Sequence, residues 1–143
     1  MELIRVGASR WSVLLTEQVL DELSDWGSAK GPKNAMTSLL VQSVPAHGPQ
    51  EGNSTICKPM AGSDHLYEFR KGESRGPKVR VLWFYGDPQK TKVICVRAFV
   101  KTFQKTPPEE IAAATQERER YFQALEAGTL NVIEGTHLVR RKR

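Results

Sequence analysis

The sequence has few of the residues on which metal sites, disulfides and membrane spans depend. Its 143 residues include two cysteines and three histidines, and Cys57 and Cys95 fit no metal-ligand spacing. We therefore expect two reduced thiols and no metal or cofactor site. No stretch approaches the roughly 18 apolar residues of a membrane span, and the first residues lack the apolar core of a secretory signal. These absences predict a cytoplasmic protein with no membrane partner.

Acidic residues are scarce in the middle third of the chain. Residues 56–106 hold 11 Lys/Arg against 4 Asp/Glu, whereas residues 1–55 hold 4 against 6 and residues 107–143 hold 6 against 6. A localised basic excess favours a binding site for a polyanion, and nucleic acid is the most common polyanionic partner. The alternative is a basic sheet face that is simply solvated.

The apolar patterns predict an α+β fold in a single domain of residues 1–128, followed by a basic tail of residues 129–143 that we expect to be partly disordered. The expected architecture is an antiparallel β-sheet of about four strands with an N-terminal helical hairpin and a C-terminal helix. The ranges behind this expectation are a strand at 10–15, helices at 17–27 and 32–44, an extended piece at 56–60, a three-stranded meander at 65–70, 78–86 and 91–101, and a helix at 107–128.

Local signals mark both ends of the last helix. Thr106 followed three residues later by Glu109 has the spacing of a capping box, and Pro107 between them suits the first turn. Gly128 is a suitable C-terminal stop.

Basic residues recur on the neighbouring strands of the expected meander. A phosphodiester site needs such a cluster, because guanidinium groups pair bidentately with phosphate oxygens and stabilise charge that develops on phosphorus. Each arginine alone could equally be an ordinary cross-strand partner. Glu68 shares a strand face with Arg70, which leaves three roles open for it: general base, orienting group for an arginine, or simple ion pair. The basic candidates on the strands are Lys58, Arg70, Lys78, Arg80, Lys92, Arg97 and Lys101.

Three motifs together resemble a known family. They are an L-x-E-x-R strand at residues 66–70, an R-V strand start at residues 80–81, and an F-x-K junction that continues through K-T-P to E-I at residues 99–111. In this order they resemble the phage-derived HigB-like branch of the RelE/ParE toxin superfamily, over about residues 11 to 125. The junction is the most specific of the three.

The resemblance implies a RelE-like toxin of a type II toxin–antitoxin system that cleaves mRNA, free or on the ribosome. The implied reaction is metal-independent attack of a ribose 2′-hydroxyl on the adjacent phosphate, and the implied protein partner is a helix-turn-helix antitoxin. The 2′-hydroxyl restricts such a reaction to RNA. The predicted catalytic residues are Arg70, Arg80, Lys101, Lys105 and Glu68, and the predicted RNA-binding residues are Lys58, Lys78, Arg97 and Phe103.

A second class of function remains open at this point. The same fold would also suit a binding protein without nuclease activity, as in the gyrase-poisoning relatives, or a phage-derived module that binds nucleic acid or protein. Loss of RNA cleavage and of toxicity on mutation of the two arginines is the observation that separates these classes.

Overall fold

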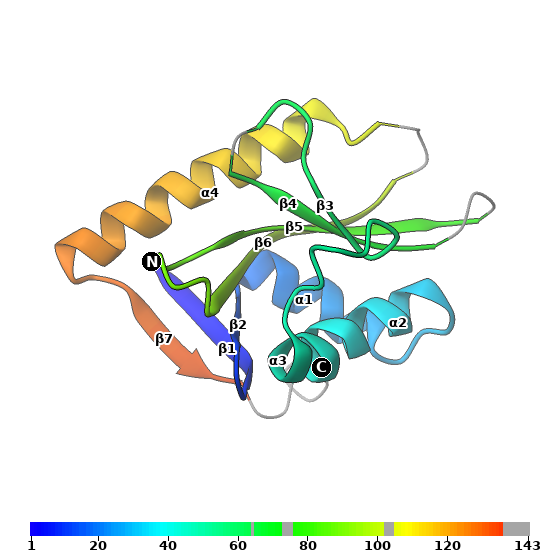
Figure 1. Cartoon of the computed structure of the whole chain (residues 1–143), viewed down its shortest axis with the longest axis horizontal. Helices are drawn as coiled ribbons and strands as arrows, with labels where there is room; N and C mark the ends of the chain where they lie inside the picture. The colour runs from blue at the N-terminus through cyan, green and yellow to red at the C-terminus, as the bar shows by residue number, and fades with distance from the viewer. Residues whose placement is uncertain (64, 73–75, 102–104, 136–143) are drawn as a thin grey trace.

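A mixed sheet with helices on both faces forms the body of the protein (Figure 1). The computed structural model describes residues 1–63, 65–72, 76–101 and 105–135. In chain order the elements are β1 (Glu2–Ala8), β2 (Ser12–Leu15), α1 (Glu17–Trp26), α2 (Pro32–Ser38), the π-helix η1 (Leu39–Ser43), α3 (Val44–His47), β3 (Cys57–Pro59), β4 (Tyr67–Lys71), β5 (Lys78–Tyr85), β6 (Lys92–Lys101), α4 (Pro108–Ala127) and β7 (Asn131–Glu134).

Within the described residues, the sheet has seven strands in the order β3-β4-β5-β6-β2-β1-β7. The pairs β3–β4, β4–β5, β5–β6 and β1–β2 are antiparallel. Two pairings are parallel, namely β2 with β6 and β1 with β7. The meander β4-β5-β6 therefore forms one side of the sheet, and the chain's first and last described strands extend the other side.

The expectation of a four-stranded antiparallel sheet with an N-terminal helical hairpin is wrong. The sheet is larger and mixed, and the chain begins with the β1–β2 hairpin rather than with helices. The three strands of the expected meander are present in the predicted order. Strands β1 and β7 lay outside the expected pattern, and β7 pairs with a partner far away in sequence.

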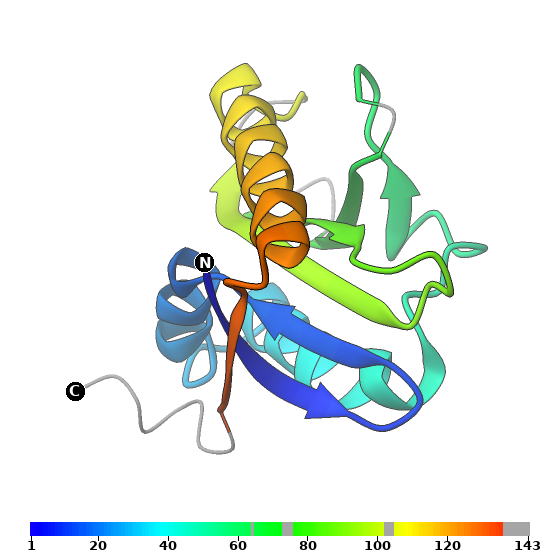
Figure 2. The same cartoon turned by 90° about the vertical axis from the view of Figure 1, so that its left-hand side faces the viewer.

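Strand β7 shows why the sequence patterns did not predict this end of the sheet. Its four residues pair with β1, where Leu3 lies opposite Val132 and Ile4 opposite Ile133 (Figure 2). Leu3 and Ile4 are buried, whereas Ile133 is exposed. A short strand that is exposed along most of its length shows little alternation of apolar and polar residues. Residues 131–134 are thus part of the sheet, although the tail was expected to begin at residue 129.

The helix expected over residues 32–44 is divided into α2, η1 and α3. Pro45 explains the division, because proline has no N–H to donate to the carbonyl four residues earlier. A π-turn is one way in which a helix absorbs such a defect. The bent segment also packs on β1, where a Cβ at Gly7 would lie 2.4 Å from the Pro45 ring.

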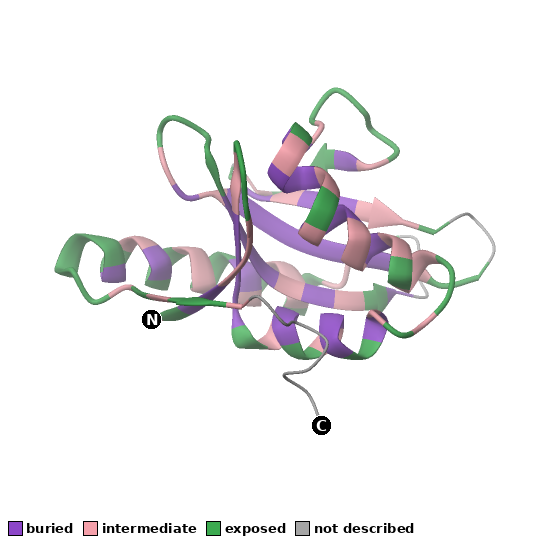
Figure 3. Cartoon of the chain, turned by 90° about the horizontal axis from the view of Figure 1, so that it is seen from below, coloured by how far each residue is buried: buried purple, intermediate pink, exposed green. Residues whose placement is uncertain are grey.

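The two faces of the sheet are buried by different helices. Helix α4 lies across one face, and α1, α2, η1 and α3 cover the other (Figure 1). Alternation along β5 divides the core accordingly: Val81 and Trp83 face α1–α3, whereas Leu82 and Phe84 face α4. Purple buried segments follow both the strands and the inner sides of the helices in Figure 3. The candidate site residues lie on the α4 face of the sheet.

Candidate functional site

The sheet register brings the charged candidates onto the face that α4 covers. Side chains directly opposite each other on antiparallel strands share a face, and side chains two residues apart on one strand do so as well. The charged residues in the pairs below are related to one another in one of these two ways. The facing pairs are Lys58 with Glu68, Arg70 with Arg80, and Lys78 with Lys101.

Glu68 lies at the centre of this set and is only 3% exposed. Its carboxylate oxygens lie 3.6 Å from Nε of Arg70 and 3.6 Å from Nε of Arg80. The same carboxylate accepts a hydrogen bond of 2.8 Å from the hydroxyl of Thr106. One buried anion therefore joins β4, β5 and the segment that leads into α4.

Arg80 is held inside the protein rather than presented to solvent. It is 2% exposed, and its Nη1 donates to the carbonyls of Lys71 at 3.1 Å and Val79 at 2.9 Å. Burial lowers the pKa of Arg80, the charge of Glu68 opposes that shift, and the charge of Arg70 adds to it. These contacts make Arg80 a fixed counter-charge that orients Glu68.

Lys101 is the second buried cation and is 6% exposed. Burial is the main cause that lowers its pKa from the usual 10.5. Glu68 opposes this shift, whereas Arg80, Arg70 and Lys58 add to it through charge repulsion. A lysine in such a setting gives up its proton more readily than an exposed lysine does, which is what proton transfer requires.

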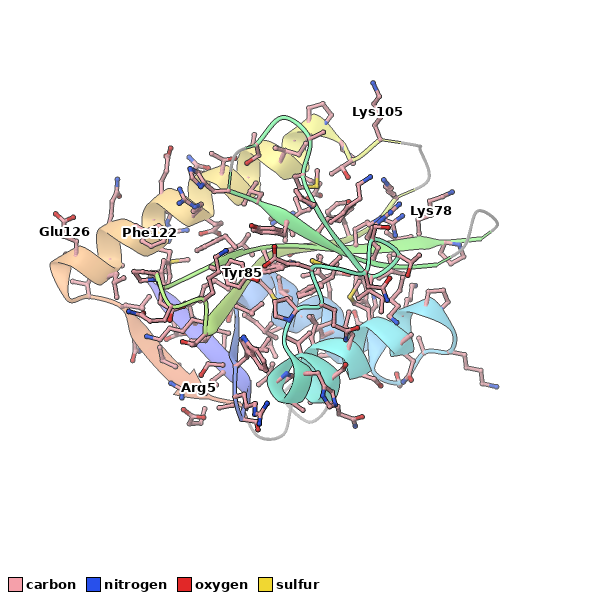
Figure 4. The ribbon with its side chains drawn as sticks, viewed as in Figure 1. Arg5, Lys78, Tyr85, Lys105, Phe122 and Glu126 are labelled. Carbon is pink, nitrogen blue, oxygen red and sulfur yellow. The ribbon has the colours of Figure 1, made fainter. Side chains whose placement is uncertain are left out.

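In front of Glu68 lies a pocket of about 460 Å³. Its walls come from the β3–β4 segment, from β4, from the end of β6 and from the start of α4. The lining residues are Lys58, Met60, Ala61, Gly62, Glu68, Arg70, Lys101, Lys105, Thr106 and Ile111. Lys105 lies at the outer rim, with its side chain pointing to solvent in Figure 4. The pocket thus carries four cations around one buried carboxylate.

The structure brings together some of the predicted site residues and separates others. Arg70, Lys101, Lys105, Glu68 and Lys58 line the pocket, and Arg80 contacts it through Glu68.

Two of the remaining RNA-binding candidates, Lys78 and Arg97, do not line the pocket. Arg97 forms an ion pair with Glu110 of α4, with 2.8 Å between Nε and Oε1. Lys78 lies opposite Lys101 but does not line the pocket. Phe103 is outside the described residues. Arg97 therefore fastens α4 to the sheet in this structure.

Thr106 has a different role from the predicted capping box. Helix α4 begins at Pro108, Pro107 is its N-cap, and no side chain caps the helix. Sequence spacing suggested a local partner for the Thr106 hydroxyl, whereas the observed acceptor is Glu68, 38 residues earlier. Nothing local in the sequence signals this contact. The predicted stop at Gly128 is confirmed by its left-handed conformation, with φ of 71°.

The cysteines do not add a nucleophile to the site. Cys57 and Cys95 are free and buried. Burial, with a smaller contribution from Glu51, raises the pKa of Cys57 to about 12. A thiol with this pKa carries almost no thiolate at neutral pH.

Two further searches cover only the described residues. Within them, no three His, Cys, Asp or Glu side chains lie together in a way that could hold a metal ion. No helix in this part of the chain is both long and apolar enough to cross a membrane.

A family model described as phage-derived protein Gp49-like (DUF891) matches residues 32–119. The match spans α2 to the middle of α4 and includes every residue that lines the pocket. The chain therefore belongs to the phage-derived Gp49-like family. This membership agrees at a coarse level with the toxin-like resemblance, while assignment to the HigB-like branch stays a prediction. No curated protein matches the chain.

Replacement of Glu68 by glutamine tests whether the buried charge holds the site together. Glu68→Gln keeps the shape and an acceptor for Thr106 but leaves the buried Arg80 without its anion. We expect a loss of roughly 3 kcal/mol in the free energy of unfolding, measured by urea denaturation. The control is Glu117→Gln, which breaks the more exposed Glu117–Arg120 ion pair and should cost less than about 1 kcal/mol. Equal losses in the two variants would contradict this role for Glu68.

The lowered pKa of Lys101 predicts a pH effect of definite sign. Between the lowered pKa of the folded state and the usual 10.5, the unfolded chain binds more protons at Lys101 than the folded chain does. Stability from this group therefore rises with pH in that window. The unfolding free energy of the wild type should increase relative to Lys101→Gln between neutral pH and about 10.5, because other titrations cancel in the difference. A flat difference for Lys101→Gln would refute the prediction.

Proposed function

We propose that this member of the Gp49-like family is the toxin of a type II toxin–antitoxin system and acts as an endoribonuclease on mRNA. The pocket in front of Glu68 carries the proposal: four lysine and arginine side chains surround a space large enough for a phosphodiester, and one of them is a buried lysine with a lowered pKa. Family membership supports the coarse class, and the pocket supports the chemistry.

The proposed substrate contacts follow from the exposure of each cation. Lys58 and Arg70 line the pocket and remain partly exposed, so that both can reach a phosphate placed in it. Charge-assisted hydrogen bonds to phosphate oxygens strengthen as negative charge grows on phosphorus. Arg80 is a positioning residue, because its guanidinium is bound to Glu68 and to two backbone carbonyls.

Glu68 acts as an orienting group rather than as a base in this proposal. Its carboxylate already accepts the Thr106 hydroxyl and lies against two guanidinium groups. Accepting a substrate proton would remove the charge that compensates the buried cations. Of the three roles that the sequence left open for Glu68, its surroundings favour orientation of the arginines.

The proton transfers are assigned to the two lysines. The buried Lys101, in its amine form, accepts the proton of the ribose 2′-hydroxyl as the 2′-oxygen forms a bond to phosphorus. The bond from phosphorus to the 5′-oxygen breaks, and the ammonium of the exposed Lys105 supplies the proton that this oxygen takes up. The products are a 2′,3′-cyclic phosphate and a 5′-hydroxyl, and no metal-bound nucleophile takes part.

The proposed partners are mRNA, free or on the translating ribosome, and a small helix-turn-helix antitoxin. An antitoxin that covered the pocket would neutralise the toxin by excluding RNA from the cations. An acidic surface on the antitoxin would complement the pocket's charge.

Single substitutions in the pocket test the nuclease directly. Arg70→Gln and Lys101→Gln should each lower the rate of RNA cleavage by roughly 10²–10³-fold, the cost typical of losing one transition-state contact. Cleavage is measured on purified RNA in the presence of EDTA and by primer extension on RNA from expressing cells. The control Arg120→Gln removes a cation from α4 outside the pocket and should cleave like the wild type. Urea midpoints show whether each variant is folded.

The outcomes distinguish the two classes of function. Growth arrest that survives both pocket substitutions, without RNA cleavage, would exclude the nuclease and leave a binding protein of the same family. Arrest and cleavage lost together in folded variants would support the proposal.

A further inference from the structure

A second pocket, of about 210 Å³, lies where β5 extends past the start of β4. Tyr67 pairs with Trp83, so the two residues of β5 that follow Trp83 have no strand beside them on that side. Aromatic rings and cations line the resulting notch. The residues that matter here are His65, Tyr67, Tyr85, Asp87, Lys90 and Arg118.

The aromatic wall of this second pocket is rigid and partly open to solvent. The rings of Tyr67 and Tyr85 meet edge-on, with 5.5 Å between their centroids. Trp83 packs behind both, at 4.7 Å from Tyr67 and 4.9 Å from Tyr85. The Tyr85 hydroxyl donates a hydrogen bond to Glu51, which restricts the ring further. Such a preformed platform loses little conformational freedom when a flat ring stacks on it.

The charges around the platform favour an anion on one side of it. Nζ of Lys90 lies 5.4 Å from the Tyr85 centroid, and Arg118 lies 4.8 Å from the centroid of Phe122. Nε of Arg118 is buried and makes no hydrogen bond within the described residues. The carboxylate of Asp87 already has hydrogen-bond partners. It accepts hydrogen bonds from the backbone N–H groups of Thr91 at 2.9 Å and of the next residue at 2.8 Å.

The two pockets are neighbours, but their walls lie partly on different faces of the sheet: Tyr67 and Tyr85 pack against the core on the α1–α3 side, whereas Arg118 belongs to α4. The segment between β3 and β4 separates the two pockets: Met60 to Gly62 line the first pocket, and His65 lines the second. Along α4, Ile111 lines the first pocket and Arg118 the second. These two positions are two helical turns apart on one face, or about 10 Å. In Figure 4, Tyr85 and Lys78 mark opposite ends of β5, with Lys105 on the Lys78 side.

We propose that the second pocket binds a nucleotide of the same RNA strand whose phosphate is cleaved in the first pocket. The base stacks on the ring of Tyr85 and meets Tyr67 edge-on, and Lys90 and Arg118 bind the flanking phosphates. Glu51, on the hydroxyl side of Tyr85, directs the phosphates to the Lys90 side. The assignment rests on the proposed function, because it takes the substrate in the first pocket to be RNA.

Binding of a non-cleavable RNA tests the proposal separately from cleavage. The probe is a fluorescent single-stranded dodecamer with 2′-O-methyl ribose throughout, and its affinity is measured by anisotropy over a range of salt concentrations. Lys90→Gln with Arg118→Gln should weaken binding about tenfold and reduce the slope of log K against log[salt] by about 1.4, since each phosphate contact on a single strand contributes about 0.7. The control is Arg10→Gln with Lys30→Gln, which removes the same charge from exposed positions outside both pockets.

The ring contribution has its own pair of variants. Tyr85→Phe keeps the stacking surface and should bind the dodecamer like the wild type, whereas Tyr85→Leu should bind roughly tenfold more weakly. If Tyr85→Leu fails to fold, the comparison of the two charge variants decides the question.

Each result separates the two proposals. Equal affinity and salt slope in the two charge variants would overturn the proposed RNA site in the second pocket. Loss of cleavage in Arg70→Gln would still support the proposed nuclease activity. Binding that depends on Lys90 and Arg118, with no cleavage by the wild type, would support the second pocket and exclude the nuclease. Equal competition by an acidic polypeptide, with the same dependence on Tyr85, would assign the pocket to a protein partner and overturn the proposal.

Discussion

The carboxylate of Glu68 holds together three segments that are distant in the chain. It compensates two guanidinium groups, from Arg70 on its own strand and Arg80 on the next, and it accepts the hydroxyl of Thr106 at the entrance to α4. Burying Arg80 without an anion would cost several kcal/mol, so the position of β5 against β4 in this region depends on Glu68. The start of α4 depends on it too, because the helix has no side-chain cap of its own.

The same carboxylate shapes the electrostatics of the pocket. Cations outnumber it there: Lys58, Arg70, Lys101 and Lys105 all line the space, and Glu68 is the one acid among the lining residues that the structure describes. The site therefore keeps a positive potential after its internal compensation, which is the condition for capturing a phosphodiester. Burial also distinguishes the cations, since Arg80 and Lys101 are buried, Lys101 has a lowered pKa, and Lys105 is exposed to solvent.

Local patterns were sufficient for the parts of the fold that carry their own signal. The three strands of the meander alternate and are rich in β-branched and aromatic residues, and their register follows from short connections. Glu68, Arg70 and Arg80 could be grouped for this reason. Strand β7 could not be found, because its one pairing within the described residues is parallel to β1, at the other end of the described chain. Thr106 was misread for a related reason: its capping spacing is a local coincidence, and its real partner comes from β4.

The chemistry at the ends of cleaved RNA tests the central claim most directly. The account predicts fragments that carry a 2′,3′-cyclic phosphate and a 5′-hydroxyl, identified by mass spectrometry, and no cleavage at a position where one deoxyribose replaces the ribose before the cut. Fragments with a 3′-hydroxyl and a 5′-phosphate, or cleavage that persists at the deoxyribose position, would contradict the assignment of the Glu68 pocket as a site for 2′-hydroxyl attack.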